Sequence, residues 1–170
     1  MGASLVPKRL EKSAFMIDYE KEYESGVRGL IFDIDNTLVP HGAPADKRTV
    51  LLFKKLHSLG FRTLFLSNND EARVKPFAEA CESPYIYKAG KPSLKAADKA
   101  LKTLGTKKEE TLFIGDQLLT DLLAATRAGI PHAIVRPVSG KEPFHIILKR
   151  IVELPFLAVS RLKQKNRRAT

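Results

Sequence analysis

The chain has 170 residues, enough for one domain with a proper hydrophobic core but too few for two domains of ordinary size. Its 44% hydrophobic and 28% charged residues are typical of a soluble globular protein, and no stretch approaches the roughly 18 consecutive apolar residues of a membrane-spanning helix. The net charge of +10 and the pI near 9.8 predict an acidic partner: nucleic acid, anionic lipid or a phosphorylated substrate.

The single cysteine, Cys81, excludes an internal disulfide and a cysteine-rich metal site, so we expect a structural thiol that is at least partly buried. The first residues carry Lys8, Arg9, Glu11 and Lys12 without an apolar segment behind them, which is not the pattern of a secretory signal. We therefore expect an intracellular protein in the reducing cytoplasm.

Apolar runs and amphipathic segments follow one another along most of the chain. Residues 1–26 carry scattered apolar positions between charges, and we predict an N-terminal arm with at most one short helix. The apolar runs beyond it predict five strands, at residues 30–35, 61–66, 85–87, 111–114 and 132–135. Apolar residues at helical spacing between these runs predict four helices, at residues 46–59, 71–81, 91–104 and 118–128.

This alternation of strands and helices determines the expected fold class. Strands linked by helices of this length form right-handed parallel crossovers. We therefore predict an α/β protein, a doubly wound three-layer sandwich around a mainly parallel five-stranded sheet. We expect this domain to span residues 27–140, between an N-terminal arm of residues 1–26 and a C-terminal helix with a basic tail at residues 141–170.

Two aspartates, Asp33 and Asp35, stand one residue apart directly after the apolar run at residues 30–32. Burying two like charges together is unfavourable unless an opposite charge compensates them. A bound Mg²⁺ would do so, because it prefers oxygen ligands and shares its coordination shell with substrate phosphate. The alternative interpretation is a polar strand-to-loop transition with one capping aspartate.

Further polar residues follow the other predicted strands. Ser67 and Asn68 end the second strand, Lys91 opens the third helix, and Asp116 and Asp121 follow the fourth strand. Ligands of doubly wound sheets bind outside the carboxyl ends of the strands, so we expect one pocket to collect these groups. Carboxylates, Mg²⁺ and a lysine suit a phosphorylated substrate, and a carboxylate can attack phosphorus in line to form an aspartyl-phosphate.

The order of these groups resembles the four motifs of the haloacid-dehalogenase-like (HAD) superfamily of phosphohydrolases, over about residues 28–138. The matching residues are Asp33-Ile34-Asp35-Asn36-Thr37, Ser67, Lys91 and Gly115-Asp116-Gln117-Leu118-Leu119-Thr120-Asp121. The resemblance implies that Asp33 is the nucleophile and a metal ligand. It implies that Asp35 is the general acid and base and gives the metal its backbone carbonyl.

The remaining matched residues are expected to bind the phosphoryl group and the metal. The resemblance implies that Ser67, with the neighbouring Asn68, holds the phosphoryl group and that Lys91 offsets its charge. Asp116 would complete the Mg²⁺ site, and Asp121 would either bind the metal or orient the groups that bind it. Family members that stop at the phospho-enzyme typically lack the second aspartate of the first motif, so its presence here favours hydrolysis over the alternative, transfer of phosphate to an organic acceptor.

Substrate choice in this superfamily usually belongs to a cap domain inserted after the first motif or between the second and third. One loop and one helix account for residues 39–61, and a helix and a short strand account for residues 70–91, so we expect no cap domain and an open site. The first two motifs are similar to those of the YqeG-like branch of HAD subclass IIIA, which is related to phosphatases of phosphatidylglycerophosphate. The resemblance thus implies a Mg²⁺-dependent hydrolase of phosphomonoesters, and its YqeG-like part points to the phospholipid phosphatidylglycerophosphate as a candidate substrate.

The C-terminal segment combines an apolar stripe with a basic end. The stripe consists of Phe144, Ile147, Leu148, Ile151 and Val152; we expect Pro155 to interrupt the helix, and five basic residues follow between 161 and 168. Such a stripe more often belongs to a last helix packed on the sheet, with the basic end as a solvated tail, and this is the interpretation we favour. The layout is also typical of a helix on an anionic bilayer, which would bring peripheral contact with the inner face of the membrane. The third alternative is a non-catalytic protein that binds nucleic acid, which we do not expect. The sequence leaves the oligomeric state open.

Overall fold

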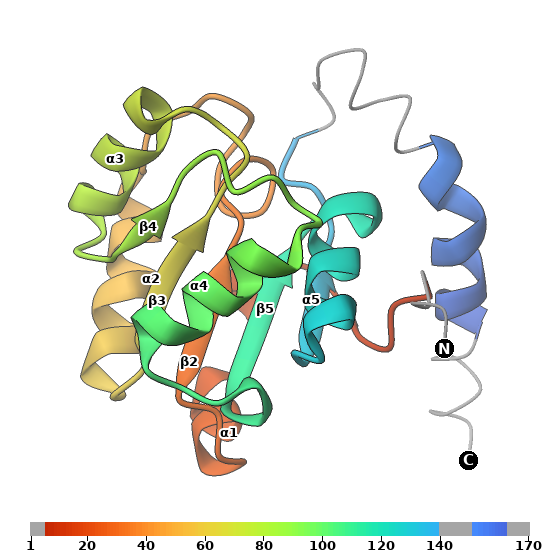
Figure 1. The fold of residues 1–170 in the computed structure, drawn as a ribbon, viewed down its shortest axis with the longest axis horizontal. Coiled ribbons are helices and arrows are strands. Elements are labelled where there is room, and N and C mark those ends of the chain that lie inside the picture. The colour runs from red at the N-terminus through yellow and green to blue at the C-terminus, as the bar shows by residue number, and fades with distance from the viewer. Residues whose placement is uncertain (1–5, 140–150, 163–170) are drawn as a thin grey trace.

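The computed structural model describes residues 6–139 and 151–162. In this part of the chain a parallel sheet separates two layers of helices (Figure 1). Its strands are β1 (Leu10–Glu11), β2 (Gly29–Phe32), β3 (Arg62–Leu66), β4 (Tyr85–Ile86), β5 (Thr111–Gly115) and β6 (His132–Val135). They lie in the order β1-β6-β5-β2-β3-β4, and every neighbouring pair is parallel.

Five α-helices connect or precede these strands: α1 (Tyr19–Glu24), α2 (Lys47–Ser58), α3 (Glu71–Ala80), α4 (Leu94–Leu104) and α5 (Leu123–Ala128). A π-helical turn, Leu118–Leu122, leads into α5, and short 3-10 helices lie at Ala14–Met16 and Lys108–Glu110. Helices α1 to α3 pack on one face of the sheet, and α4 and α5 pack on the other. The doubly wound α/β architecture predicted from the sequence is confirmed.

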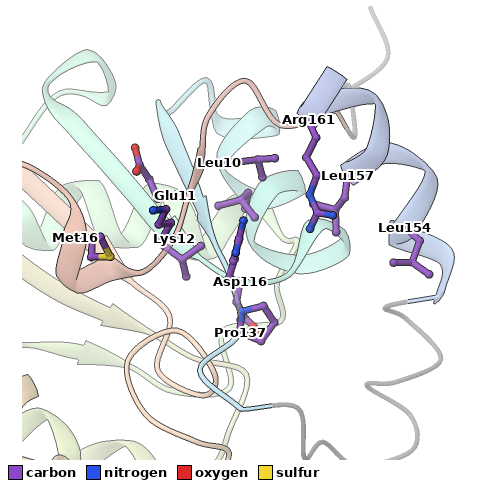
Figure 2. A pocket seen from close by; sticks show the side chains of 12 residues that line it. Leu10, Glu11, Lys12, Met16, Asp116, Pro137, Leu154, Leu157 and Arg161 are labelled. Atoms are coloured by element: carbon purple, nitrogen blue, oxygen red, sulfur yellow. The ribbon is translucent and has the colours of Figure 1, made fainter. Parts of the chain in front are cut away.

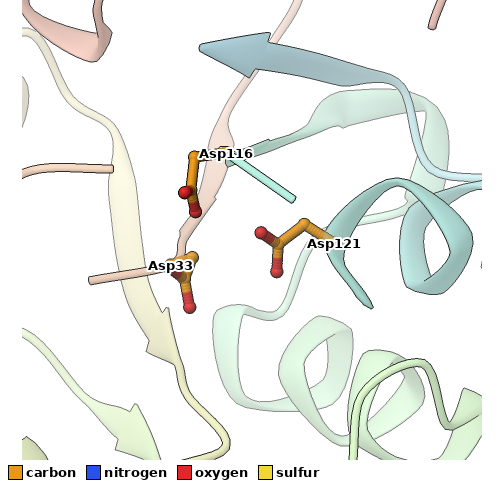
Figure 3. A group of neighbouring side chains, drawn as sticks. All are labelled: Asp33, Asp116 and Asp121. Atoms are coloured by element: carbon orange, nitrogen blue, oxygen red, sulfur yellow. The ribbon is translucent and has the colours of Figure 1, made fainter. Parts of the chain in front are cut away.

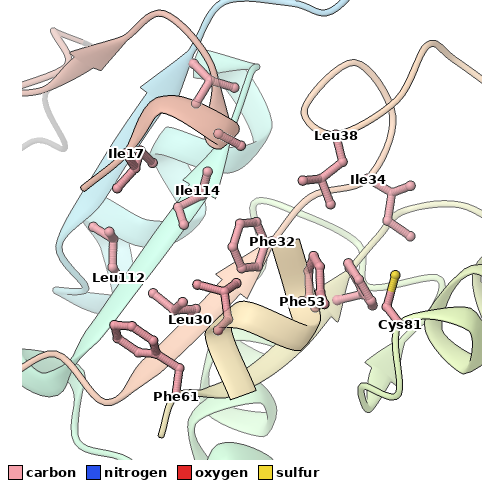
Figure 4. Close-up of a cluster of buried hydrophobic side chains, with 14 of the residues drawn as sticks. Ile17, Leu30, Phe32, Ile34, Leu38, Phe53, Phe61, Cys81, Leu112 and Ile114 are labelled. Carbon is pink, nitrogen blue, oxygen red and sulfur yellow. The ribbon is translucent and has the colours of Figure 1, made fainter. Parts of the chain in front are cut away.

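The central strand β2 is buried along its whole length, because helices cover both faces of the sheet. Leu30 and Phe32 point toward the layer of α1 to α3 (Figure 4). Ile31 between them packs on the side of α4 and α5. In the first layer the ring of Phe53 lies 5.0 Å from that of Phe32 and 4.7 Å from that of Phe65, centroid to centroid. This packing holds the end of β2, and with it the following residue Asp33, in a defined place.

Local signals explain where several helices begin and end. The carboxylate of Asp46 accepts a hydrogen bond of 2.7 Å from the backbone N–H of Thr49, which caps the start of α2. Gly105 and Gly129 adopt left-handed backbone angles directly after α4 and α5, a conformation that terminates helices and that glycine adopts without strain.

Two of the connections bear on the expected absence of a cap domain. The chain between β2 and β3 consists of a loop and α2, and the chain between β3 and α4 contains only α3, β4 and short loops. Neither of the two places at which a cap domain would be inserted holds one in the described chain.

The structure corrects three expectations. The sheet has six strands rather than five, because Leu10–Glu11 of the expected N-terminal arm pairs with Ile134 and Val135 at the edge of the sheet. This arm also forms a 3-10 helix besides α1, where at most one short helix was expected. The helix expected from Lys91 begins only at Leu94, which leaves Lys91 in the preceding turn.

Residues 151–162 form a continuous helix against the edge of the sheet, so the expected interruption at Pro155 is wrong. Pro155 lies on the exposed side of this helix, where water can bond to a carbonyl that lacks its helical donor. The apolar positions expected at residues 144–148 and the basic positions at residues 163–168 lie outside the described residues. No helix in the described ranges is both long and apolar enough to cross a membrane.

Two buried polar contacts and an apolar cluster fasten this helix. A carboxylate oxygen of Glu153 accepts a hydrogen bond of 3.0 Å from the N–H of Leu119, and the hydroxyl of Ser160 donates one of 2.6 Å to the carbonyl of Pro7. Phe156 and Leu157 pack on Leu118, Leu122, Ile134 and Leu10. The helix thus contacts both the N-terminal segment and the π-helical turn that carries Asp121.

Candidate active site

Three buried aspartates meet at the carboxyl edge of the sheet. Asp33 follows β2 and Asp116 follows β5, and these two strands are hydrogen-bonded neighbours in register. Asp121 joins them from the π-helical turn that follows β5. Each offers one carboxylate oxygen to a group of three in which all oxygens lie within 4.8 Å of one another (Figure 3).

Asp121 reaches this position because the backbone of β5 comes close to it at Gly115. A Cβ atom added to Gly115 would lie 2.5 Å from the Cβ and the carboxylate of Asp121, so no other residue fits there unless Asp121 moves. The second oxygen of Asp121 accepts a hydrogen bond of 3.1 Å from the N–H of Gln117. The glycine therefore sets how closely the third carboxylate approaches.

Lys91 supplies the positive charge inside the cluster. Its ammonium lies 2.6 Å from an oxygen of Asp33 and 2.7 Å from an oxygen of Asp121, and its side chain is only 3% exposed. The N–H of Lys91 donates a hydrogen bond of 2.7 Å to the side-chain oxygen of Asn68, which anchors this loop to the end of β3. The lysine stands in the turn before α4 and enters the site across the end of the sheet.

The electrostatics of the cluster follow from this arrangement. Burial raises the pKa of Asp33 to about 7; Lys91 opposes this rise, and the negative charges of Asp121 and Asp35 add to it. Burial alone would lower the pKa of Lys91, but attraction to Asp121 and Asp33 outweighs burial and raises it. With three carboxylates and one ammonium in contact, the cluster carries excess negative charge that a further cation would offset.

The hydroxyl of Thr37 bridges two of the aspartates. Its oxygen lies 3.3 Å from the second oxygen of Asp33 and 3.2 Å from an oxygen of Asp116, and Thr37 is fully buried. One hydroxyl proton is therefore shared between two carboxylates. Sequence reasoning placed Thr37 in the first motif but gave it no task.

The carboxylate of Asp35 is held apart from this cluster by three donors. It accepts hydrogen bonds from the N–H of Gly42 at 2.7 Å, from a guanidinium nitrogen of Arg73 at 2.9 Å and from the side-chain amide of Asn69. The sequence analysis did not predict these contacts of Arg73 and Asn69 with Asp35. Only the fold brings the start of α3 to the loop after β2, so no local signal could have found this contact.

The two remaining predicted residues lie at the end of β3. Ser67 is 1% exposed, and its hydroxyl oxygen accepts a hydrogen bond of 3.2 Å from the N–H of Asn69. Its carbonyl accepts one of 3.0 Å from the N–H of Ala89, which ties β3 to the loop that carries Lys91. The predicted residues thus form two neighbouring groups. Asp33, Asp116 and Asp121 form one cluster with Lys91, which contacts the first and the last of them, and Ser67, Asn68 and Asp35 lie around it.

The acidic cluster fits a divalent metal ion by its chemistry. Asp33, Asp116 and Asp121 supply hard carboxylate oxygens within one small volume, and their combined charge exceeds that of Lys91. Mg²⁺ is bound in proteins by one or two carboxylates together with water and phosphate oxygens. Three converging carboxylates are sufficient for such a site.

Comparison with known proteins agrees with this geometry. The sequence profile of a family described as haloacid dehalogenase-like hydrolase matches residues 45–129. The chain is 41% identical over 162 residues to a Bacillus subtilis protein named "Probable phosphatase YqeG", and the match covers 95% of this chain and 93% of that protein. The chain therefore belongs to the haloacid dehalogenase-like hydrolases and is a phosphohydrolase.

Two weaker relatives carry a more specific name. Phosphatidylglycerophosphate phosphatase 1 of Chlamydomonas reinhardtii is 29% identical over 81% of this chain, and that of Arabidopsis thaliana is 26% identical over 90%. The chain spans 55% and 47% of their lengths, about half of each protein. A candidate HAD family hydrolase from Streptomyces avermitilis has the same fold, with a TM-score of 0.55, 17% sequence identity and a match over 80% of each chain.

Proposed function

We propose that the protein is a Mg²⁺-dependent phosphatase that hydrolyses a phosphomonoester through an aspartyl-phosphate on Asp33. The observation that carries this proposal is the contact of the Asp33 carboxylate with the buried ammonium of Lys91 beside Asp116 and Asp121. A carboxylate in such a place can act as a nucleophile toward phosphorus, and the surrounding charges suit the anionic group it attacks.

In the first step an oxygen of Asp33 attacks phosphorus and the ester bond to the leaving oxygen breaks. For this step Asp35 must carry a proton in the complex with substrate, and it gives this proton to the leaving oxygen as the bond opens. Ser67 and Asn68 hold the transferring phosphoryl group by hydrogen bonds, and Lys91 offsets its negative charge. The contacts of Lys91 and Thr37 with the two oxygens of Asp33 orient the nucleophile before substrate arrives.

In the second step Asp35 takes a proton from water, which attacks the phosphorus of the acyl-phosphate. The bond between phosphorus and Asp33 breaks, inorganic phosphate leaves, and the Asp33 carboxylate is restored. Arg73 and Asn69 would keep Asp35 in the same orientation during both steps. Mg²⁺, held by Asp33, Asp116 and Asp121 with the backbone carbonyl of Asp35, would neutralise charge on the phosphoryl oxygens.

For the substrate we propose phosphatidylglycerophosphate, or a phosphomonoester of similar chemistry, at the inner face of a membrane. The names of the two weaker relatives support this choice. The net charge of +10 also supports it, because it attracts an anionic surface. So do the short connections after β2 and β3, since a site without a cap domain suits a large substrate that itself excludes water.

The decisive experiment is phosphate release by the purified full chain, with Mg²⁺ or with EDTA, on phosphatidylglycerophosphate in mixed micelles and on a panel of soluble phosphomonoesters. Asp33→Asn keeps the shape of the nucleophile and should lower kcat by about a thousandfold or more, because covalent catalysis is lost. Full activity of this variant would overturn the mechanism. Turnover of soluble esters alone would support the proposed reaction but exclude the phospholipid as the substrate.

A further inference from the structure

A pocket of about 520 Å³ lies beside the acidic cluster and is shared by parts of the chain that are far apart in sequence. Its walls are β1, the end of β6 with the two residues after it, and the helix of residues 151–162 (Figure 2). Asp116 also lines it, so the pocket shares one residue with the proposed metal site. Leu10, Ile134, Leu154 and Leu157 give it an apolar lining.

Three cationic side chains also line this pocket: Lys12, Arg136 and Arg161. Two acidic residues line it as well: Asp116, which belongs to the proposed metal site, and Glu11, whose carboxylate pairs with Arg9 at 2.7 Å. Within the described ranges none of the three cations has a carboxylate partner. The pocket is therefore apolar in its lining and positively charged in its polar groups, which suits an anionic amphiphile.

We propose that this pocket binds the leaving-group part of a glycerophospholipid substrate, with the phosphodiester near Arg136, Arg161 and Lys12 and the acyl-glycerol part against the leucines. The inference rests on the phosphatase function proposed above. A phosphomonoester bound at Asp33 must direct its ester oxygen and leaving group away from the buried cluster, and the pocket begins at the neighbouring Asp116. A soluble monoester without a second anionic group would leave the three cations without a ligand.

The outer face of the helix of residues 151–162 indicates what lies beyond the pocket. Glu153, Phe156 and Ser160 turn toward the protein. Leu154, Leu157 and Arg161 of the same helix line the pocket. The remaining side of the helix is also apolar and exposed: Ile151 is 57%, Val152 52%, Val159 41% and Leu162 64% exposed. A helix that is apolar on nearly all sides belongs in an apolar environment.

The occupant of this outer face is an anionic bilayer rather than a second copy of the chain. Basic residues continue beyond the helix in the sequence, at Lys163, Lys165, Arg167 and Arg168, and the whole chain carries +10. Two such surfaces would repel one another, whereas anionic headgroups attract them. The helix would thus lie in the bilayer interface with the pocket beside it, at the depth of the headgroups.

Equilibrium binding tests the pocket without any turnover. The full chain is titrated with short-chain phosphatidylglycerol below its micelle concentration, a product analogue that has the phosphodiester but no phosphomonoester. Arg136→Gln/Arg161→Gln should weaken binding about tenfold or more, since each lost ionic hydrogen bond is large. The charge-matched control is Lys99→Gln/Lys102→Gln on the exposed side of α4, which should bind like the wild type. Equal affinity of all three proteins would overturn the proposal.

Kinetics separate failure of the pocket from failure of the phosphatase function. The ratio of kcat/KM for the phospholipid to kcat/KM for a soluble phosphomonoester should fall about tenfold in the arginine variant. An equal loss on both substrates would mean that the arginines act on the fold or on the catalytic centre, and the pocket assignment would fail. If no substrate released phosphate, the proposed phosphatase function would be wrong. The titration with short-chain phosphatidylglycerol would still show whether the pocket binds the lipid.

Vesicle sedimentation tests the outer face. Ile151→Ser/Leu162→Ser should lose binding to vesicles that contain phosphatidylglycerol but keep wild-type affinity for the short-chain lipid. A wild-type dimer in solution that this variant converts to a monomer, with vesicle binding unchanged, would assign the face to a second copy and overturn the bilayer.

Discussion

The proposed catalytic end of the sheet, around Lys91 and the aspartates, differs from the pocket beside it in how its charges are placed. At the catalytic end, Lys91 and the aspartates it contacts are buried, and opposite charges touch at 2.6 Å and 2.7 Å. In the pocket, Lys12, Arg136 and Arg161 are exposed beside apolar walls and lack acidic partners among the residues described. The first region is complete apart from the metal and phosphate it would bind, whereas the second is complementary to something outside the chain.

This difference has an energetic side. Burying an ion pair removes both charges from water, and the attraction between them only about offsets this loss of hydration. The cluster around Lys91 therefore adds little net stability, and its value lies in the geometry that it fixes. Exposed cations stay hydrated, so the lack of an acidic partner changes the free energy of unfolding little. A change at the catalytic end should therefore disturb both folding and catalysis, and a change in the pocket should act mainly on binding.

The largest effect is expected for Lys91→Met. Removing the ammonium leaves Asp33 and Asp121 buried without their partner, so the free energy of unfolding in EDTA should fall by about 3 kcal/mol or more. Mg²⁺ should restore part of this loss, since it can neutralise the same carboxylates. Activity should fall at least about a hundredfold, because the phosphoryl charge is no longer offset.

Urea unfolding with and without Mg²⁺ measures the stability effect, and Lys99→Met provides an exposed control. Stability of Lys91→Met equal to that of the wild type in EDTA would mean that the buried cluster is not held by this ammonium. It would also remove the contrast with the pocket.

Sequence reasoning succeeded where the signal is local or strongly periodic. The apolar runs located the strands that become β2, β3, β4, β5 and β6, and the rule that ligands bind at carboxyl strand ends brought Asp33, Asp116 and Lys91 together before any coordinates. Two-residue β1 was missed, because an edge strand between charged residues has no detectable period. The pocket was missed because its walls meet only through the fold.

Gly115→Ala tests how tightly the third carboxylate is set. The added Cβ would lie 2.5 Å from Asp121, so this carboxylate must shift away from Asp33 and Asp116. The Mg²⁺ concentration for half-maximal activity should rise about tenfold or more, the usual scale for disturbing the groups that orient metal ligands. If the glycine acts through Asp121, the double variant Gly115→Ala/Asp121→Ala should need the same Mg²⁺ concentration for half-maximal activity as Asp121→Ala alone.

On the pocket side, Glu153→Leu should loosen the helix of residues 151–162. It removes the acceptor for the N–H of Leu119 in a site that is 1% exposed, and should cost about 1–3 kcal/mol of unfolding free energy. The ratio of phospholipid to soluble-ester activity should fall with it, because this helix forms one wall of the pocket. Glu153→Gln keeps an acceptor oxygen, so it should retain most of the unfolding free energy and most of the activity ratio. An identical loss in the two variants would contradict the anchoring role of the Glu153 side chain.

The smallest expected effect concerns His132, which begins β6 behind the pocket wall. Burial lowers the pKa of His132 from 6.5 to about 4, and the nearby charge of Lys8 adds to the shift. Since the unfolded chain then binds a proton that the folded chain does not, this residue contributes stability above pH 6.5 that is lost as the pH falls toward 4. Compared with His132→Gln, the wild type should lose about 2 kcal/mol more of its unfolding free energy between neutral and weakly acidic pH, with partial exposure taken into account. Parallel pH profiles of the two proteins in urea unfolding would show that water reaches the imidazole, and that this edge of the sheet is as accessible as the pocket beside it.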